Sequence, residues 1–295
     1  MSEPAASLSL MRRGDMIWPA SGTFENAARL LEHAANASTS AAAGDYREIP
    51  GKYLKWVADH LPALQSFLAP HDLNRFLTTP RYWATLASQD TSPGHIGAIT
   101  SEIHRNATAM SSAVAELRAF TEAWKPSSAY ASYVAFDTNF WMDHDDSFAA
   151  TDWHQYAGPA GDPLPDIVAA SELRIVVPLL VVDELDRLTH RGDKGAKARA
   201  VTKALYQWVE ATPGQAHTIK EPAPESGPVR LQVLFDPAGH RRNPNNDDEL
   251  IDRIRTLRDG IEHHPQRFWF ASGDGGARFR GSVDGLNVRN TRHDT

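Results

Sequence analysis

The sequence predicts an α/β domain, with a parallel sheet flanked by helices, preceded by an all-helical N-terminal domain. Apolar residues recur at helical spacing through much of the first 124 residues, whereas short β-branched and aromatic runs alternate with helical segments after residue 130. The two patterns meet at a Lys-Pro-Ser-Ser stretch at 125–128. A chain of 295 residues is long for one core and ordinary for two. We therefore expect a helical domain over residues 1–125 and an α/β domain over residues 129–295.

The N-terminal half predicts amphipathic helices. After a loose start and a Ser/Ala/Gly stretch at 34–44, the segment 51–68 places its apolar residues on one stripe. Asp72 is the expected N-cap of a second helix that runs towards Ala87, and Pro80 breaks or restarts that helix. Apolar residues at three- and four-residue steps then predict one long helix over 95–124. Its apolar face either packs within the helical domain or serves a homo-oligomer or a protein partner.

The C-terminal half predicts strands that exit into acidic residues. Apolar strands at 133–136 and 175–177 alternate with helical segments, which is typical of a parallel sheet covered by helices. Sites in such sheets lie beyond the carboxyl ends of the strands. The acids that follow these strands are therefore the candidates for chemistry.

Acids follow predicted strands, or lie on the helices after them, in four separated segments. Asp137 ends the first strand, and Glu184 lies on the helix after the second. Asp247 and Asp248 open an amphipathic helix, and Asp274 follows a last aromatic strand between glycines. Each acid alone has an ordinary structural explanation as a turn, an exposed helix position or a helix cap. Their order and their shared context are what indicate a site.

Taken together, the four segments resemble the PIN domain family. The first strand ends in Asp137-Thr138-Asn139, and the second passes through a proline into the helix that bears Glu184. The third acid stands in an Asn-Asp-Asp run at 246–248, and the fourth in a Ser-Gly-Asp run at 272–274. The resemblance covers residues 130–288. Two features depart from the family pattern: an acidic insert at 142–170, which contains Asp143, Asp145 and Asp146, and the glycines after position 274.

The resemblance implies an endoribonuclease that needs Mg²⁺ or Mn²⁺, cleaves single-stranded RNA, and leaves 5′-phosphate and 3′-hydroxyl ends. One or two ions held by carboxylates would neutralise charge on the phosphate and activate water. The implied metal ligands and catalytic residues are Asp137, Glu184, Asp247, Asp248 and Asp274, with Asp247 preferred over Asp248 as the inward acid. The implied supporting residues are Thr138, Asn139 and Ser272.

Basic and aromatic residues near these segments are candidates for RNA binding. The basic candidates are Arg187, Arg191, Lys194, Lys197, Arg199 and Lys203 around the second helix, with Arg241 and Arg242 before the third acid. An ordinary solvated helix face also explains the first group. Trp153, Tyr156 and Trp269 either stack on bases or pack in the core.

Composition excludes or disfavours several other classes. The absence of cysteine excludes disulfides, thiolate metal sites and cysteine nucleophiles. A net charge of -7 disfavours nonspecific coating of nucleic acid. No signal peptide and no apolar run of membrane-spanning length occurs, so we expect no membrane partner and a cytoplasmic protein.

Three alternatives stay open. The first is a catalytically silent PIN-like binding or scaffold module that acts with a protein partner. The second is a phosphatase or receiver domain with Asp137 as phosphoryl acceptor, although position 139 is Asn and not a second aspartate. The third is hydrolysis by a histidine-bound metal, although no HExxH motif occurs among the 13 histidines. Toxin, decay and defence nucleases are not distinguished, although the helical extension disfavours a plain toxin of a toxin-antitoxin pair.

Overall fold

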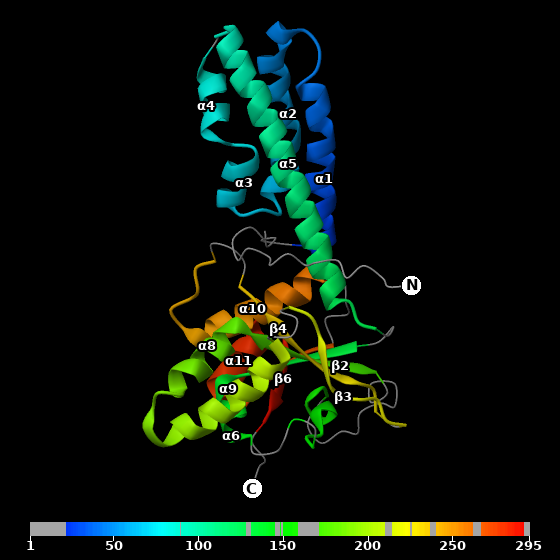
Figure 1. Ribbon diagram of the computed structural model, residues 1–295, viewed down its shortest axis with the longest axis vertical. Coiled ribbons are helices and arrows are strands. Elements are labelled where there is room, and N and C mark those ends of the chain that lie inside the picture. The colour runs from blue at the N-terminus through cyan, green and yellow to red at the C-terminus, as the bar shows by residue number, and fades with distance from the viewer. Residues whose placement is uncertain are drawn as a thin grey trace. The chain divides into compact units, whose positions relative to one another are not determined.

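The computed structural model describes residues 22–88, 90–127, 131–144, 148, 150–158, 171–209, 214–224, 226–236, 240–261 and 267–291. The chain divides into two compact units, Met1–Glu122 with Pro237–Gly239, and Ala123–Asp236 with His240–Thr295. In the described part of the chain, every strand lies in the second unit (Figure 1). No described helix is long and apolar enough to cross a lipid bilayer.

The first unit is helical. Its helices are α1 (Phe24–Ala41), α2 (Ile49–Gln65), α3 (Pro70–Phe76), α4 (Pro80–Ala87) and all but the last two residues of α5 (Pro93–Trp124), with a 3-10 turn η1 (Tyr46–Glu48) before α2. The long periodic segment is confirmed as α5, and the expected break before Pro80 is confirmed because α3 and α4 are separate helices. Ile99, Ile103 and Met110 of α5 are buried, as core packing of its apolar face requires.

Two expectations for this unit are wrong. The loose start and the Ser/Ala/Gly stretch expected before the first periodic segment are not what the structure shows, because helix α1 covers Phe24–Ala41 and so includes most of residues 34–44. Alanine is the best helix former, and Ala27, Ala34 and Ala41 are buried along one face of α1. Asp72 is not an N-cap either: α3 begins at Pro70, so Asp72 lies inside the helix and is buried.

The second unit contains one six-stranded sheet of order β3-β4-β2-β1-β5-β6. In that order the strands are β3 (His217–Lys220), β4 (Val229–Leu234), β2 (Glu172–Pro178), β1 (Ala131–Phe136), β5 (Phe268–Ser272) and β6 (Asn287–Asn290). Among the pairs formed by these six strands, only β3–β4 is antiparallel. Helices flank this mostly parallel sheet, which confirms the predicted α/β class.

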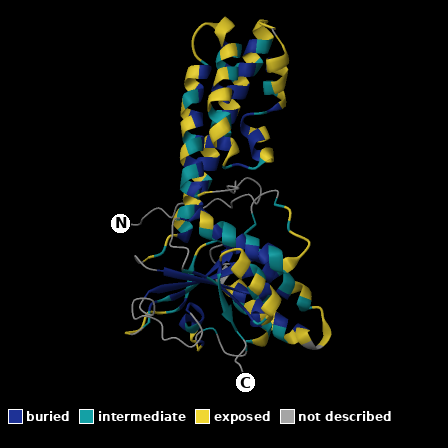
Figure 2. Cartoon of the chain, turned by 180° about the vertical axis from the view of Figure 1, so that it is seen from behind, coloured by how far each residue is buried: buried dark blue, intermediate teal, exposed yellow. Residues whose placement is uncertain are grey.

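The central strands are buried along their whole length, and this explains their apolar sequences. Every residue of β1 and β2 is buried, as expected for strands covered on both faces. Figure 2 shows these strands in dark blue, with exposed surface on the outer sides of the helices. The helices are α6 (Thr138–Asp143), α8 (Leu179–Leu188), α9 (Gly195–Val209), α10 (Asn246–Gly260) and α11 (Gly275–Val283), with 3-10 turns η2 (Trp153–Tyr156) and η3 (Gly192–Lys194).

The strand order brings the four acidic segments to one edge. Strands β4, β2, β1 and β5 are consecutive parallel neighbours, so their carboxyl ends point the same way. Each of these four strands is followed by one of the acidic segments. The chain moves from β1 to β2 and β4 on one side and then returns to β5 on the other. The order therefore reverses between β1 and β5, where doubly wound sheets bind their ligands.

Buried polar contacts fix the start of the second unit to the sheet. Arg174 of β2, 1% exposed, donates to the carbonyls of Ala123 and Lys125, each at 3.1 Å, and pairs with Glu172 at 2.6 Å. Ser127 donates to Glu172 through its backbone N–H at 2.8 Å and its hydroxyl at 2.6 Å. Burial raises the pKa of Glu172, but Arg174 and Ser127 outweigh burial and hold it below its usual value. Lys125 and Ser127, which belong to the stretch at 125–128 where the two predicted domains meet, are thus tied to β2. The rest of the predicted boundary, at 128–129, lies outside the described residues.

Candidate active site at the carboxyl edge of the sheet

Asp137 lies at the end of β1 and is buried, with 5% of its surface exposed. It is the N-cap of α6, because its Oδ1 accepts a hydrogen bond of 2.8 Å from the backbone N–H of Phe140. Its Oδ2 accepts one of 2.5 Å from the hydroxyl of Ser272, the last residue of β5. The cap explains why a short polar residue follows the strand, and the bond from Ser272 joins two neighbouring strand ends.

Asp274 follows β5 and caps α11. Its Oδ1 accepts hydrogen bonds from the backbone N–H groups of Gly276 at 2.6 Å and Ala277 at 3.0 Å. Its own backbone N–H donates to the Ser272 hydroxyl at 2.9 Å. A Cβ added at position 276 would lie only 3.1 Å from the Asp274 carboxylate, so the glycine there lets the backbone approach closely. The departure from the family pattern after Asp274 therefore has a local structural cause.

Glu184 of α8 connects two other segments. One of its carboxylate oxygens accepts a hydrogen bond from the hydroxyl of Thr138, and the other accepts one from the side-chain amide of Asn246. Thr138 starts α6 and Asn246 starts α10, so the Glu184 side chain bridges the first and third acidic segments. The supporting position predicted for Thr138 thus has a defined partner, whereas Asn139 is exposed beside it.

Neither Asp247 nor Asp248 caps α10, although helix capping was the simplest structural explanation for acids at this position. The N-cap of α10 is Asn245, whose side chain accepts from the backbone N–H of Asp247 at 3.0 Å. Both carboxylates instead face Arg280 of α11, which lies 2.5 Å from Asp247 Oδ2 and 3.0 Å from Asp248 Oδ1. Sequence reasoning missed Arg280. The only available signal was a basic residue on the helix that follows Asp274.

The pKa values show that the carboxylates interact. Burial raises the pKa of Asp137; hydrogen bonds from Ser272 and Phe140 oppose this rise, and repulsion from Asp247 and Asp274 adds to it.

Burial also raises the pKa of Asp247. The charge of Arg280 opposes this rise, whereas repulsion from Asp274, Glu184 and Asp248 adds to it. The Asp247 carboxylate therefore interacts with acids of all four segments, which favours Asp247 over Asp248 as the inward acid.

The donor chemistry of this cluster fits a hard divalent cation. The side chains offer carboxylate and hydroxyl oxygens, and no thiolate exists in the chain. In the structure these oxygens are directed at protein partners, and among the described residues no three His, Asp or Glu side chains are grouped closely enough to hold an ion. Ion binding would therefore require some of these protein contacts to rearrange.

Most of the predicted basic residues lie on a helical hairpin. Arg187, Arg191, Lys194, Arg199 and Lys203 are exposed on α8, α9 and the turn between them, and Lys197 is half-buried. Arg199 also donates to the carbonyl of Thr189 at 2.7 Å.

The two arginines before α10 differ in their surroundings. Arg241 is exposed, but Arg242 lies 2.7 Å from Asp183 and 2.6 Å from Asp236, so its charge is already paired.

A buried acid that sequence reasoning passed over supports the loop before α10. Glu249, 1% exposed, lies 2.6 Å from His240 and accepts from the backbone N–H of Asn243 at 2.8 Å.

Two of the three aromatic candidates belong to the core. Trp153 and Tyr156 of η2 are buried and pack around Phe136, with ring centroids 5.7 and 5.2 Å from it. They are not accessible to a base, whereas Trp269 is half-buried.

Within the acidic insert, Asp143 is exposed at the end of α6, while Asp145 and Asp146 lie outside the described residues.

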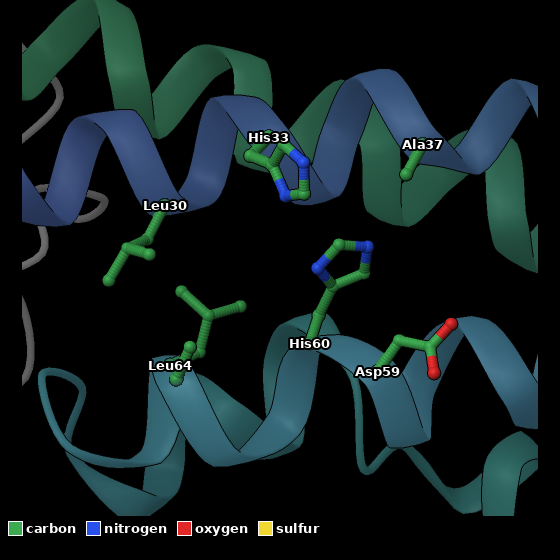
Figure 3. Close-up of a pocket in the computed structure, with 7 residues that line it drawn as sticks. Leu30, His33, Ala37, Asp59, His60 and Leu64 are labelled. Carbon is green, nitrogen blue, oxygen red and sulfur yellow. The ribbon is translucent and has the colours of Figure 1, made fainter.

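A groove of about 430 Å³ in the helical unit contains two histidines (Figure 3). His33 of α1 and His60 of α2 face each other with ring centroids 5.1 Å apart, and Asp59 beside them pairs with Lys55 at 2.9 Å. Burial, and then the charge of His33, lower the pKa of His60. No third ligand completes this pair within the described residues, so the groove gives no support to a histidine-bound hydrolytic metal.

Fold and site together define an α/β protein with acids gathered at the switch point of its sheet. A family model for the PIN domain matches residues 134–292, more than half of the 295-residue chain. The chain therefore belongs to the PIN domain family. PIN domains are usually nucleases and generally use divalent metal ions. No curated protein matches the chain significantly.

Proposed function

We propose that this protein is a metal-dependent endoribonuclease that cleaves phosphodiester bonds of single-stranded RNA. The observation that carries the proposal is the position of the Asp137 side chain. Its buried carboxylate ends the central strand of a PIN-domain sheet, shares Ser272 with the Asp274 segment, and is repelled by Asp247 and Asp274. Gathering like charges in this way is costly unless a cation compensates them.

In this proposal Asp137, Glu184, Asp247 and Asp274 hold one or two Mg²⁺ or Mn²⁺ ions. When bound, the ions neutralise charge on the phosphate and lower the pKa of a water. Ser272 orients Asp137 through its hydrogen bond, and Thr138 and Asn246 orient Glu184. Asp248 shares Arg280 with Asp247 and supports the same helix start.

The exposed basic hairpin supports RNA as the substrate. Arg187, Arg191 and Lys194 follow Glu184 on α8 and the turn after it, and all three are exposed, so they are available to contact backbone phosphates. Each contact with a backbone phosphate releases counterions and makes binding dependent on salt. We expect the double variant Arg191→Gln/Lys194→Gln to weaken RNA binding and reduce its salt dependence. A charge-matched Lys52→Gln/Lys55→Gln variant in the helical unit should change neither.

The proposal is tested by cleavage of labelled single-stranded RNA by the full-length protein with chelator, Mg²⁺ or Mn²⁺. We expect cleavage only with a divalent ion, products with 5′-phosphate ends, and a loss of more than about 100-fold in Asp137→Asn. Asp259→Asn removes an exposed acid of α10 that pairs with Arg258, and it should cleave like wild type. A matched DNA strand shows whether RNA is preferred.

The same assay decides the alternative of a silent scaffold. If no RNA is cut with either ion, or if Asp137→Asn cleaves like wild type, the site is not a nuclease and a binding role remains. Exposed Trp83 and Leu86 on α4 suit contact with a protein partner or a second copy of the chain. Light scattering of wild type and Trp83→Ser tests self-association through this helix. Cytoplasmic localisation and a place in a toxin-antitoxin, decay or defence system stay predictions.

A further inference from the structure

Arg280 is the positive charge that the structure places against the acidic cluster. Its guanidinium contacts Asp247 Oδ2 at 2.5 Å and Asp248 Oδ1 at 3.0 Å. About two-fifths of each of the three side chains is exposed: 38% for Arg280, 41% for Asp247 and 44% for Asp248. Arg280 therefore offsets one of the two negative charges of the third acidic segment at the protein surface.

The fold directs Arg280 to this position. Asp274 caps the first turn of α11 and fixes its start directly after β5. Arg278 on the same helix donates to the Ser272 carbonyl at 2.7 Å and to the Asn290 side chain at 2.9 Å, so it ties α11 to the strands. Arg280, two residues on, faces the start of α10 instead.

A guanidinium and a divalent ion compete for the same atoms. Asp247 Oδ2, which Arg280 contacts, belongs to one of the proposed metal ligands. The guanidinium offers only N–H donors and one charge, so it compensates repulsion but cannot bind or activate water as a metal does. Ion binding through this oxygen requires the contact with Arg280 to break or shift.

We propose that Arg280 is a resident counter-ion, a positioning residue that holds Asp247 and Asp248 while the site is free of metal and yields the Asp247 carboxylate when a divalent ion binds. This inference rests on the proposed function, because it concerns the ion of that site. It means that Arg280 stabilises the metal-free protein and weakens its affinity for divalent ions. The site would then fill with divalent ions at a higher ion concentration than it would if Arg280 were absent.

The test is calorimetric titration of the full-length protein with Mn²⁺ alone, without RNA. We expect Arg280→Gln to bind Mn²⁺ about tenfold more tightly than wild type, since one nearby positive charge is removed at a partly exposed site. Arg255→Gln is the matched control. Arg255 is 43% exposed and lies 2.9 Å from Asp252 and 3.7 Å from Asp284 on the same unit. Its loss changes the net charge equally and should leave Mn²⁺ affinity unchanged.

Thermal melting supplies a second readout. With chelator, Arg280→Gln should melt below wild type, and saturating Mn²⁺ should raise its melting temperature by more than it raises that of wild type. If Arg280→Gln does not fold, the Mn²⁺ affinity of Arg280→Lys tests the inference in its place. A lysine keeps the charge but cannot contact both acids in the same way, so its Mn²⁺ affinity should be about threefold above wild type.

The outcomes separate this inference from the nuclease proposal. Unchanged or weaker Mn²⁺ binding by Arg280→Gln, or an equal gain in Arg255→Gln, overturns the role of Arg280 and leaves the nuclease proposal standing. Tighter binding by Arg280→Gln without cleavage of any RNA supports the role of Arg280 and overturns only the nuclease. Absence of Mn²⁺ binding by wild type and variants overturns both.

Discussion

The hydroxyl of Ser272 donates a hydrogen bond of 2.5 Å to Oδ2 of Asp137, across 135 residues of sequence. The same hydroxyl accepts from the backbone N–H of Asp274 at 2.9 Å and is fully buried. One oxygen atom thus fixes the carboxylate at the end of β1 relative to the turn after β5. Because both acids are proposed metal ligands, this small contact sets their separation.

Removing the hydroxyl should therefore damage the site more than the fold. We predict that Ser272→Ala lowers divalent-ion affinity and RNA cleavage about 10- to 100-fold, and costs about 1–3 kcal/mol because a buried donor and acceptor lose their partner. Ion titration, cleavage rates and urea unfolding measure these effects. Ser272→Thr keeps the hydroxyl and should retain most of the activity. Equal activity of wild type and the alanine variant would contradict the role given to Ser272.

The raised pKa of Asp137 predicts a pH-dependent stability difference. Burial and repulsion from Asp247 and Asp274 place its folded pKa above the unfolded value of 3.8, so the ionised carboxylate destabilises the metal-free fold. This cost is absent well below pH 3.8, grows as the pH rises from 3.8 towards the folded pKa, and is constant above the folded pKa. Without metal, Asp137→Asn should therefore be more stable than wild type at neutral pH, and the gain should vanish towards pH 3.8.

Chemical unfolding of both proteins in chelator across this pH range measures the difference. Asp259→Asn, which removes an acid at an exposed position, is the control variant for this measurement. Adding Mn²⁺ should stabilise wild type and not Asp137→Asn. A stability difference that is constant with pH would show that the substitution acts through packing or hydrogen bonds and not through charge.

Asp247 and Asp248 form a matched pair for assigning the third ligand. Both contact Arg280 and both are about two-fifths exposed, but of the two it is the charge of Asp247 that helps to raise the pKa of Asp137. We predict that Asp247→Asn lowers cleavage more than about 100-fold and that Asp248→Asn lowers it less than about tenfold. Single-turnover cleavage at saturating Mn²⁺ tests this assignment. The reverse order of the two losses would place Asp248 in the site.

The buried contacts of Arg174 predict where an independently folding nuclease domain must begin. A chain that starts at Glu122 keeps the carbonyls of Ala123 and Lys125, whereas one that starts at Tyr130 leaves Arg174 without them. We propose that the second domain includes residues 123–127, and we predict that the shorter chain is less stable by roughly 3 kcal/mol. Urea unfolding of both chains measures the difference. Equal stability would return the boundary to the stretch at 125–128 expected from the sequence.

Much of the fold was predictable because its signals are local. Strands β1 and β2 are buried on both faces and therefore apolar throughout, and α5 repeats a helical pattern over many turns. The acids after these strands follow from the rule that sites lie at the carboxyl edge of a parallel sheet. The strand order makes β2, β1 and β5 consecutive parallel neighbours, so the acids that follow them lie at the same edge of the sheet.

The remaining features depend on tertiary structure that the sequence does not encode locally. Strand β4 carries Arg230 and Gln232, which interrupt its apolar run, and the burial of Gln232 is explained by its hydrogen bonds to Arg174 and Ala123. The ion pairs of Arg280 form because α10 and α11 pack together. Helix capping was ambiguous at the acidic run before α10, because Asn245 and its acidic neighbours are all good caps.

The most direct test of the central claim, that acids of four segments form one metal site, is anomalous diffraction from crystals of the full-length protein soaked in Mn²⁺. We predict an anomalous peak about 2 Å from a carboxylate oxygen of Asp137 and in reach of Asp247, Glu184 or Asp274. The same soak of Asp137→Asn crystals should lose that peak. A wild-type crystal that diffracts well but shows no Mn²⁺ at these carboxylates, or shows it only elsewhere, would contradict the account.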